Sequence, residues 1–258
     1  MHQLEFFGKN FPGKSCGVRV NPGVGSGAFA KISTGGRSSS FGIWHEKMEE
    51  VKKIAEMYHL NITKLHFHIG SENSPEGWVA SAEFGFPILE KFPTITHFDM
   101  GGGHKMAIMP FEKQADLQAI GNALALKFQD FYEKTGRKIH LEMEPGKYLT
   151  INSYSMITEI QDIVDTHDLS LSLQALTPTL SQGERGQTRY AVVGHCCESS
   201  DLLTCKLYEA ETIETREFPE ARIGDYLVVD GVGAYNAGMA IKNYNSFPES
   251  GELLLRES

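Results

Sequence analysis

Alternation of apolar and polar residues in the first half of the chain predicts a series of β-strands. Residues 64–69 place apolar side chains at every second position, with histidines at two of the positions between them. A period of two is the pattern of a strand that buries one face. Similar apolar runs predict further strands at residues 18–20, 95–100 and 138–144.

Stretches between these strands have the spacing of amphipathic helices. Residues 46–58 carry apolar side chains three and four positions apart, with charged residues elsewhere, and this is the helical period. A longer stretch of the same kind begins near Leu117 and stops at Gly136, a residue type that commonly ends helices. Strands that alternate with helices are typical of an α/β fold with a parallel sheet.

The pattern changes after Lys147, and we predict a domain boundary there. We expect an α/β domain over residues 1–147 and a mostly β C-terminal domain over residues 148–258. The second half contains no long helical pattern, and strands are favoured at residues 157–164, 190–193 and 226–229.

An atypical insert lies at about residues 166–188. It is polar and turn-rich, and it has no period. One interpretation is a surface loop. The other is foreign sequence, because the segment resembles translated interspersed-repeat DNA.

Composition and charge narrow the classes of partner. The chain has 258 residues, of which 41% are hydrophobic, so it can bury one large core or two modest ones. A net charge of −9 argues against nucleic acid or an anionic membrane as the main partner. No apolar run has the length of a membrane span, and the N-terminus lacks the pattern of a signal peptide. The four cysteines form no CxxC pair, so we expect no structural metal and a reducing cytoplasm.

Two histidines lie in the strand predicted at residues 64–69. His66 and His68 share one face, and Gly70-Ser71 follows with a hydroxyl group and a backbone N–H. Three interpretations stay open: structural histidines, which this motif alone favours, a His-x-His metal site, or an imidazole stacked on a flat cofactor ring.

Glycines and carboxylates follow the other predicted strands. The run Gly101-Gly102-Gly103 comes directly after a strand, and its N–H groups could hold a phosphate, although a plain turn is at least as common. Glu142 and Glu144 share one face of the next strand. A carboxylate there could hold a proton on a ring nitrogen or form an ordinary ion pair.

Two more motifs occur in the second half. Residues 194–201 (GHCCESSD) place thiols beside carboxylates, which suits proton transfer, but adjacent cysteines can also pack as small apolar groups. Tyr235 ends the turn GVGAY, where its hydroxyl could meet a phosphate or simply pack.

The motifs HFHIGS, DMGGG, EPGK, CCESSD and GVGAY stand in the order found in the fold-type III pyridoxal-phosphate decarboxylases. Within that group the chain resembles the diaminopimelate decarboxylases, which form L-lysine from meso-2,6-diaminopimelate in lysine biosynthesis. The resemblance covers nearly the whole chain except residues 166–188. It implies an incomplete (β/α)8 TIM-like barrel followed by a mostly β domain, pyridoxal 5'-phosphate as cofactor, an amino-acid substrate, and a homodimer with shared active sites.

The resemblance also assigns roles to single residues. His68 would stack against the pyridine ring and take part in catalysis, and Glu144 would keep the ring nitrogen protonated. Cys197 would act as an acid near the substrate α-carbon, Glu198 would bind the distal ammonium, and Lys147 would bind a substrate carboxylate. The phosphate ligands would be Ser71, Gly101, Gly102, Gly103 and Tyr235.

Three departures from the family pattern lower the expected activity. Nothing resembles the family's Tyr-Ala-x-Lys-Ala segment, which carries the lysine that binds the cofactor, so we expect an N-terminally truncated chain with impaired activity. Lys147 stands where the family has arginine, and an ammonium orients a carboxylate less well than a guanidinium. The insert at 166–188 replaces an Arg-Pro-x-Leu-Tyr stretch that binds substrate. A partial barrel would also expose an apolar interior.

Other functions stay open at the level of the sequence. A related decarboxylase of ornithine, arginine or carboxynorspermidine would share the fold and the cofactor. A non-catalytic homologue could compete for dimer formation. A metal hydrolase built on His66 and His68 would need further ligands from other strand ends, and it would leave the GGG, EPGK and CCES motifs unexplained.

Overall fold

The chain divides into two compact units, Met1–Thr150 and Ile151–Ser258. The computed structural model describes residues 1–23, 36, 39–109, 111–164, 186–196, 201–206, 209–240 and 242–255.

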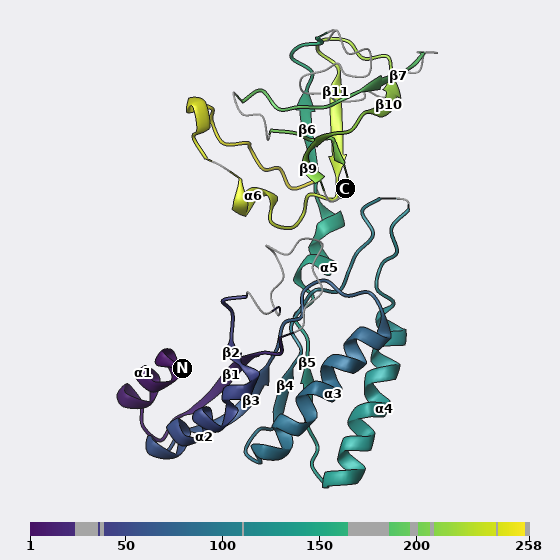
Figure 1. Cartoon of the computed structure of the whole chain (residues 1–258). Helices are drawn as coiled ribbons and strands as arrows, with labels where there is room; N and C mark the ends of the chain where they lie inside the picture. Colours follow the sequence, from purple (N-terminus) through teal and green to yellow (C-terminus); the bar gives the residue numbers. More distant parts are fainter. Residues whose placement is uncertain are drawn as a thin grey trace. The chain divides into compact units, whose positions relative to one another are not determined.

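A five-stranded parallel sheet forms the centre of the first unit, in the order β2-β1-β3-β4-β5 (Figure 1). Its strands are β1 (Ser15–Asn21), β2 (Ile43–Trp44), β3 (Asn61–His66), β4 (His97–Asp99) and β5 (His140–Glu142). Parallel neighbours require crossover connections, and helices lie between most of these strands in the chain. The α/β class with a parallel sheet is therefore confirmed.

The first unit contains both of the helices that the apolar spacing predicted. The helix at 46–58 is present as a 3-10 turn followed by α2, and α4 ends where Gly136 takes a left-handed φ of 68°. Asp116 begins α4 by accepting the backbone N–H of Ala119 at 2.9 Å. The elements are α1 (His2–Asn10), η2 (His45–Lys47), α2 (Met48–Met57), α3 (Pro75–Lys91), α4 (Leu117–Thr135) and α5 (Gly146–Thr150).

The sequence pattern did not predict the helix α3, which contains Gly85 and Pro87, two residue types that are unfavourable inside helices. Ser74 caps its start with a side-chain hydrogen bond, and Pro75 is its first residue. A Cβ atom at Gly85 would lie 2.4 Å from the ring of Phe98 in β4. The glycine therefore allows this helix to approach the sheet closely.

One face of the sheet packs against α2, α3 and α4, and the main core lies between them (Figure 1). Burying side chains of this size is the largest favourable contribution to folding. The largest fully buried side chains of this unit are Ile62, Leu65, Phe67, Trp78, Leu89, Ile95, Phe98, Met100, Ile120 and Leu124.

Three strands end earlier than the apolar runs predicted. The runs at 64–69, 95–100 and 138–144 end as strands at His66, Asp99 and Glu142. Beyond these residues the backbone bends at Gly101, with a φ of 73°, and the regular ladder stops. The remaining residues form the loops at the carboxyl edge of the sheet.

The second unit contains antiparallel strand pairs among its described residues, namely β6 with β11, β7 with β10 and β8 with β9. Ile160, Tyr190, Val192 and Leu227 form its buried cluster. The elements are η3 (Ile151–Ser153), β6 (Ser155–Glu159), β7 (Gln187–Tyr190), β8 (Cys205–Lys206), β9 (Glu209–Ile213), β10 (Arg216–Pro219), β11 (Tyr226–Asp230), α6 (Asn236–Met239) and η4 (Tyr244–Ser246).

The predicted insert at 166–188 lies almost entirely outside the described residues, since the description resumes at residue 186 and β7 begins at Gln187. Within the described part of the chain, no helix is both long and apolar enough to cross a membrane.

Candidate functional site

The sheet face opposite the helices is polar. Strand register places Arg19, His66, Asp99 and Glu142 in one row across four neighbouring strands, with Lys64 in the row behind, two residues before His66. The residues between them, such as those of the main core, point toward the helices. The prediction that a partial barrel would expose an apolar interior is therefore wrong for these strands. Their side chains on this face are charged groups and imidazoles.

The glycine run lies where three loops meet at the carboxyl ends of β3, β4 and β5. A Cβ atom would lie 2.5 Å from the carbonyl oxygen of Phe67 if placed on Gly101, and 2.3 Å from that of Glu144 if placed on Gly102. On Gly103 it would lie 1.7 Å from the carbonyl oxygen of Gly70. Only glycine fits at these contacts.

Backbone hydrogen bonds join the same loops. The N–H of Glu144 donates to the carbonyl of Gly101 at 3.0 Å, and the N–H of Glu72 donates to that of Gly103 at 2.9 Å. The N–H of Gly101 donates to Asp99 Oδ1 at 3.0 Å. The histidine, glycine and EPG motifs therefore converge at one edge of the sheet, as parallel strands require of their carboxyl ends.

His68 is held beside the glycine run as a neutral ring. The backbone N–H of Gly70 donates to its Nδ1 at 3.2 Å, which places the ring proton on Nε2. Burial lowers the pKa of His68, and the nearby charges of Arg19 and His66 lower it further. A Cβ atom on Gly103 would lie 3.4 Å from its Cε1. A flat, uncharged ring next to a glycine turn suits stacking on an aromatic ligand.

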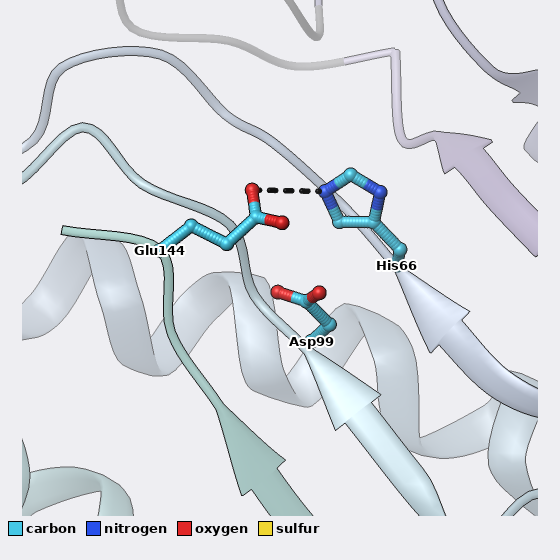
Figure 2. A group of neighbouring side chains, drawn as sticks. All are labelled: His66, Asp99 and Glu144. Atoms are coloured by element: carbon cyan, nitrogen blue, oxygen red, sulfur yellow. Dashed lines mark ion pairs between the residues drawn. The ribbon is translucent and has the colours of Figure 1, made fainter. Parts of the chain in front are cut away.

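His66, Asp99 and Glu144 form a compact group beside His68 (Figure 2). One donor atom from each lies within 4.8 Å of the others, and His66 Nε2 is 3.7 Å from Glu144 Oε2. Burial lowers the pKa of His66, while the carboxylates of Asp99 and Glu144 oppose that effect. Asp99 is deeply buried, with only 7% of its side chain exposed, whereas Glu144 is 55% exposed. Glu144 is therefore the carboxylate of this group that a ligand can reach.

Lys64 places a positive charge between the carboxylates of Asp99 and Glu142. Its ammonium donates a hydrogen bond to Glu142 and lies 3.8 Å from Asp99 Oδ2. The bond raises the pKa of Lys64 and lowers that of Glu142. The hypothesis of a metal site at His66 and His68 requires further ligands from other strand ends, and Asp99 and Glu144 are near His66. Since Lys64 already supplies a cation at this point, we assign no metal.

Some predicted site residues lie away from the sheet edge where the histidine, glycine and EPG motifs meet. Ser71 follows the His68 loop at an exposed position, and Lys147 is partly buried in α5. Tyr235 belongs to the second unit, with a φ of 72° before α6, and its side chain is 66% exposed. Cys197 and Glu198 lie outside the described residues.

The sequence pattern missed Lys64, Asp99 and Arg19 as members of the site. A signal was present, because Lys64 alternates with the two histidines on one strand face and Asp99 stands two residues before the glycine run. The partners of Lys64 could not be found this way, since Glu142 is 78 residues away and only strand register brings it near.

Comparison with known proteins gives consistent matches. The family model "Pyridoxal-dependent decarboxylase, pyridoxal binding domain" matches residues 1–172. The diaminopimelate decarboxylase of Buchnera aphidicola subsp. Schizaphis graminum is 32% identical, over 99% of this chain and 66% of the relative. That of Escherichia coli K12 is 30% identical, over 97% of this chain and 64% of the relative.

Solved structures agree with these matches. A crystal structure of a diaminopimelate decarboxylase has a TM-score of 0.82 and 26% identity, covering 96% of this chain and 64% of that one. The arginine decarboxylase of Paramecium bursaria Chlorella virus, at 16% identity and a TM-score of 0.73, shares the fold alone. The chain thus spans 64% to 66% of the length of these diaminopimelate decarboxylases. The chain belongs to the pyridoxal-dependent decarboxylases, and residues 1–172 match their pyridoxal-binding domain.

Proposed function

We propose that this chain carries the cofactor site of an enzyme that decarboxylates meso-2,6-diaminopimelate to L-lysine. The enzyme would be a pyridoxal-phosphate-dependent carboxy-lyase acting on an amino acid. Relatives of that name match at about 30% identity over nearly the whole chain. The single structural observation behind the proposal is the convergence of His68, the glycine run and Glu144 at one sheet edge.

The residues at this edge fit pyridoxal phosphate. Its pyridine ring needs a flat, uncharged neighbour, and His68 is a neutral imidazole beside the glycine turn. Its ring nitrogen needs a carboxylate, and the exposed side chain of Glu144 is suitable. When bound, the cofactor supplies an electron sink for the carbanion left as carbon dioxide departs. Glu144 would hold the proton on the ring nitrogen that this chemistry requires.

Phosphate binding would fall mainly to the backbone after β4. The N–H of Gly101 is already used by Asp99, so we assign the phosphate chiefly to Gly102 and Gly103, with Gly101 shaping the turn. Ser71 would add a hydroxyl donor from the neighbouring loop. Tyr235 would contribute its hydroxyl from the second unit, as the family resemblance implies.

Substrate recognition is proposed from the resemblance. Lys147 would pair with a substrate carboxylate as a point charge. Glu198 would bind the distal ammonium, and Cys197 would move a proton at the substrate α-carbon. A substrate with charges at both ends, such as diaminopimelate, would satisfy both charged residues.

The proposal extends to architecture and assembly. The five parallel strands would belong to a (β/α)8 TIM-like barrel domain over residues 1–147, followed by a mostly β domain over residues 148–258. The protein would act as a homodimer with shared active sites. The cysteine pattern favours a reducing cytoplasm.

Equilibrium binding of pyridoxal phosphate, followed by assays with four candidate substrates, tests the proposal. We expect saturable binding of pyridoxal phosphate, and carbon dioxide release from meso-2,6-diaminopimelate in preference to ornithine, arginine or carboxynorspermidine. The same assay measures the activity that the sequence predicts to be impaired. Failure to bind pyridoxal phosphate would overturn the cofactor assignment, and preference for another amino acid would overturn the substrate.

A further inference from the structure

Lys64 occupies an unusual place on the polar face of the sheet. Its side chain is on the same side of β3 as His66, but one row further from the carboxyl edge. From there its ammonium reaches carboxylates of two other strands, Asp99 in β4 and Glu142 in β5. One lysine therefore bridges three adjacent strands, one row behind His66 and Asp99, which Figure 2 shows.

Without a cation this arrangement would be unfavourable. Asp99 and Glu142 are register partners on one face, and like charges directly opposite each other destabilise a sheet. Asp99 is also almost completely buried, where an unpaired carboxylate is costly. The ammonium of Lys64 offsets both effects.

We propose that Lys64 is a positioning residue of the cofactor site: it ties Asp99 to Glu142 and thereby leaves Glu144 as the carboxylate available to the ring nitrogen. This inference rests on the proposed function. Lys64 itself does not touch the ligand, because it lies behind the row that faces the sheet edge. It acts through the charges of its neighbours.

His66 connects this network to Glu144. The groups that face His66 are Arg19 from β1, Lys64 and His68 from its own segment, Asp99 from β4, and Glu144 from the loop after β5. If the lysine charge were removed, the carboxylates would attract a proton to His66. A protonated His66, 3.7 Å from Glu144 Oε2, would then compete with the ring nitrogen for that carboxylate.

Substitution of Lys64 separates this role from simple packing. The variants are Lys64→Met, the charge-retaining Lys64→Arg, and the double variant Lys64→Met with Glu142→Gln. The matched control is Lys91→Met, because Lys91 also forms an ion pair, with Glu49 at 3.2 Å, but both partners are exposed.

Two measurements are made on each variant. The first is the NMR titration of His66 without cofactor, with its signal identified by its loss in His66→Gln. The second is the affinity for pyridoxal phosphate between about pH 6 and 9, the range in which histidine charge changes. We expect Lys64→Met to move the His66 midpoint to higher pH and to weaken the cofactor roughly tenfold near neutral pH, as losing an orienting neighbour typically does. Lys64→Arg should recover most of both properties. The double variant still leaves Asp99 without its cation, so it should keep the shifted His66 midpoint.

The outcomes distinguish this inference from the proposed function. If the unaltered protein binds pyridoxal phosphate and Lys64→Met binds it equally well, the positioning role is wrong while the cofactor site stands. A shifted His66 midpoint without weaker binding has the same meaning. If the unaltered protein does not bind the cofactor, the proposed function fails, and the positioning role fails with it. Loss of binding that Lys64→Arg does not recover, with an unchanged His66 midpoint, would indicate a packing effect and overturn the inference.

Discussion

The two units of the chain differ in what holds their functional residues in place. In the first unit, a core spanning the sheet and helices α2, α3 and α4 fixes three strand ends, and the loops beyond them are joined by close glycine contacts. In the second unit, the buried cluster consists of Ile160, Tyr190, Val192 and Leu227, and Ile157 and Val228 are exposed on its strands. Among the described residues, His68, the glycine run, Glu144 and Lys147 therefore lie in the unit with the larger core, whereas Tyr235 lies in the unit with the smaller one.

This contrast teaches that close packing, more than residue chemistry, makes the candidate site identifiable. The loops that carry His68 and Glu144 pack so closely against the glycine run that a Cβ atom on any of its three glycines would clash with a backbone carbonyl oxygen. Tyr235 has no comparable support, since its side chain is mostly exposed. Substitutions in the two units can test this difference.

The largest effect is expected from Gly103→Ala. The new Cβ would lie 1.7 Å from the carbonyl oxygen of Gly70, at a φ of 100°, so both the loop contact and the backbone conformation would be lost. We expect a loss of about 4 kcal/mol or more in unfolding free energy and no detectable cofactor binding. Chemical denaturation and equilibrium binding measure the two effects.

Gly136→Ala is the matched control for this substitution. Gly136 also has a positive φ, 68°, but nothing lies within 4 Å of its Cβ position. It should cost only about 1 kcal/mol, the strain of the backbone alone. Equal losses for the two variants would show that the close contact of the glycine run is unimportant.

Core truncations compare the two units directly. Leu65→Ala in the first unit removes a side chain with 0% exposure and should cost about 3 to 5 kcal/mol, whereas Leu227→Ala in the second should cost about 2 kcal/mol. Both tryptophans, Trp44 and Trp78, are in the first unit. Their fluorescence should therefore report the Leu65 substitution strongly and the Leu227 substitution weakly.

Leu126→Ala controls for the loss of a leucine at the surface, because Leu126 is 68% exposed. Its cost should stay within about 0.5 kcal/mol. A larger cost for Leu227→Ala than for Leu65→Ala would reverse the comparison between the units.

Glu144→Gln tests the chemical half of the site. The amide keeps the shape of the carboxylate but cannot hold a proton on the ring nitrogen, so we expect decarboxylation to fall roughly 100-fold, within the range for acid–base groups. Glu83→Gln removes a carboxylate of similar exposure, 51%, that pairs with Lys127 in an ordinary ion pair. If steady-state assays gave the same rate for both variants, Glu144 would have no role in catalysis.

The smallest effect is a dependence of stability on pH in the first unit. Burial lowers the pKa of His66, His68 and His104 in the folded protein. The unfolded chain, with histidine near pH 6.5, therefore binds protons first as the pH falls. Stability should be full above about pH 6.5 and should decline below it until the lowered pKa values are passed.

His104→Phe checks this pH dependence. His104 is 4% exposed and stacks on Trp78 with ring centroids 4.4 Å apart, so phenylalanine keeps the contact and removes the charge. Denaturation at pH 7.5 and 5.5 should show a smaller decline than in the parent protein. A decline as steep as the parent's would exclude a contribution from His104.

The sequence predicted much of this first unit because its strands and its helix α4 have clear periods. It overestimated the strands, since Phe67, Ile69 and Met100 continue the apolar alternation after the ladder has ended. It missed α3, where Gly85 and Pro87 lower the helix propensity although the buried residues keep helical spacing. Local periodicity cannot show where a strand gives way to a loop.

The convergence of residues at one sheet edge was predicted where a motif exists, and residues whose partners are distant in the sequence were missed. The roles of these residues toward a cofactor stay a prediction. His68, the glycine run and Glu144 were found from their motifs. Lys64 was not, because its meaning depends on Asp99 and Glu142, which only the register of β3, β4 and β5 brings together.

A crystal structure of the protein with pyridoxal phosphate bound tests the central claim most directly. We predict the pyridine ring over the imidazole of His68, its nitrogen within hydrogen-bond distance of Glu144, and the phosphate at the backbone of Gly102 and Gly103. A cofactor bound elsewhere, or one whose ring nitrogen faces away from Glu144, would contradict the account.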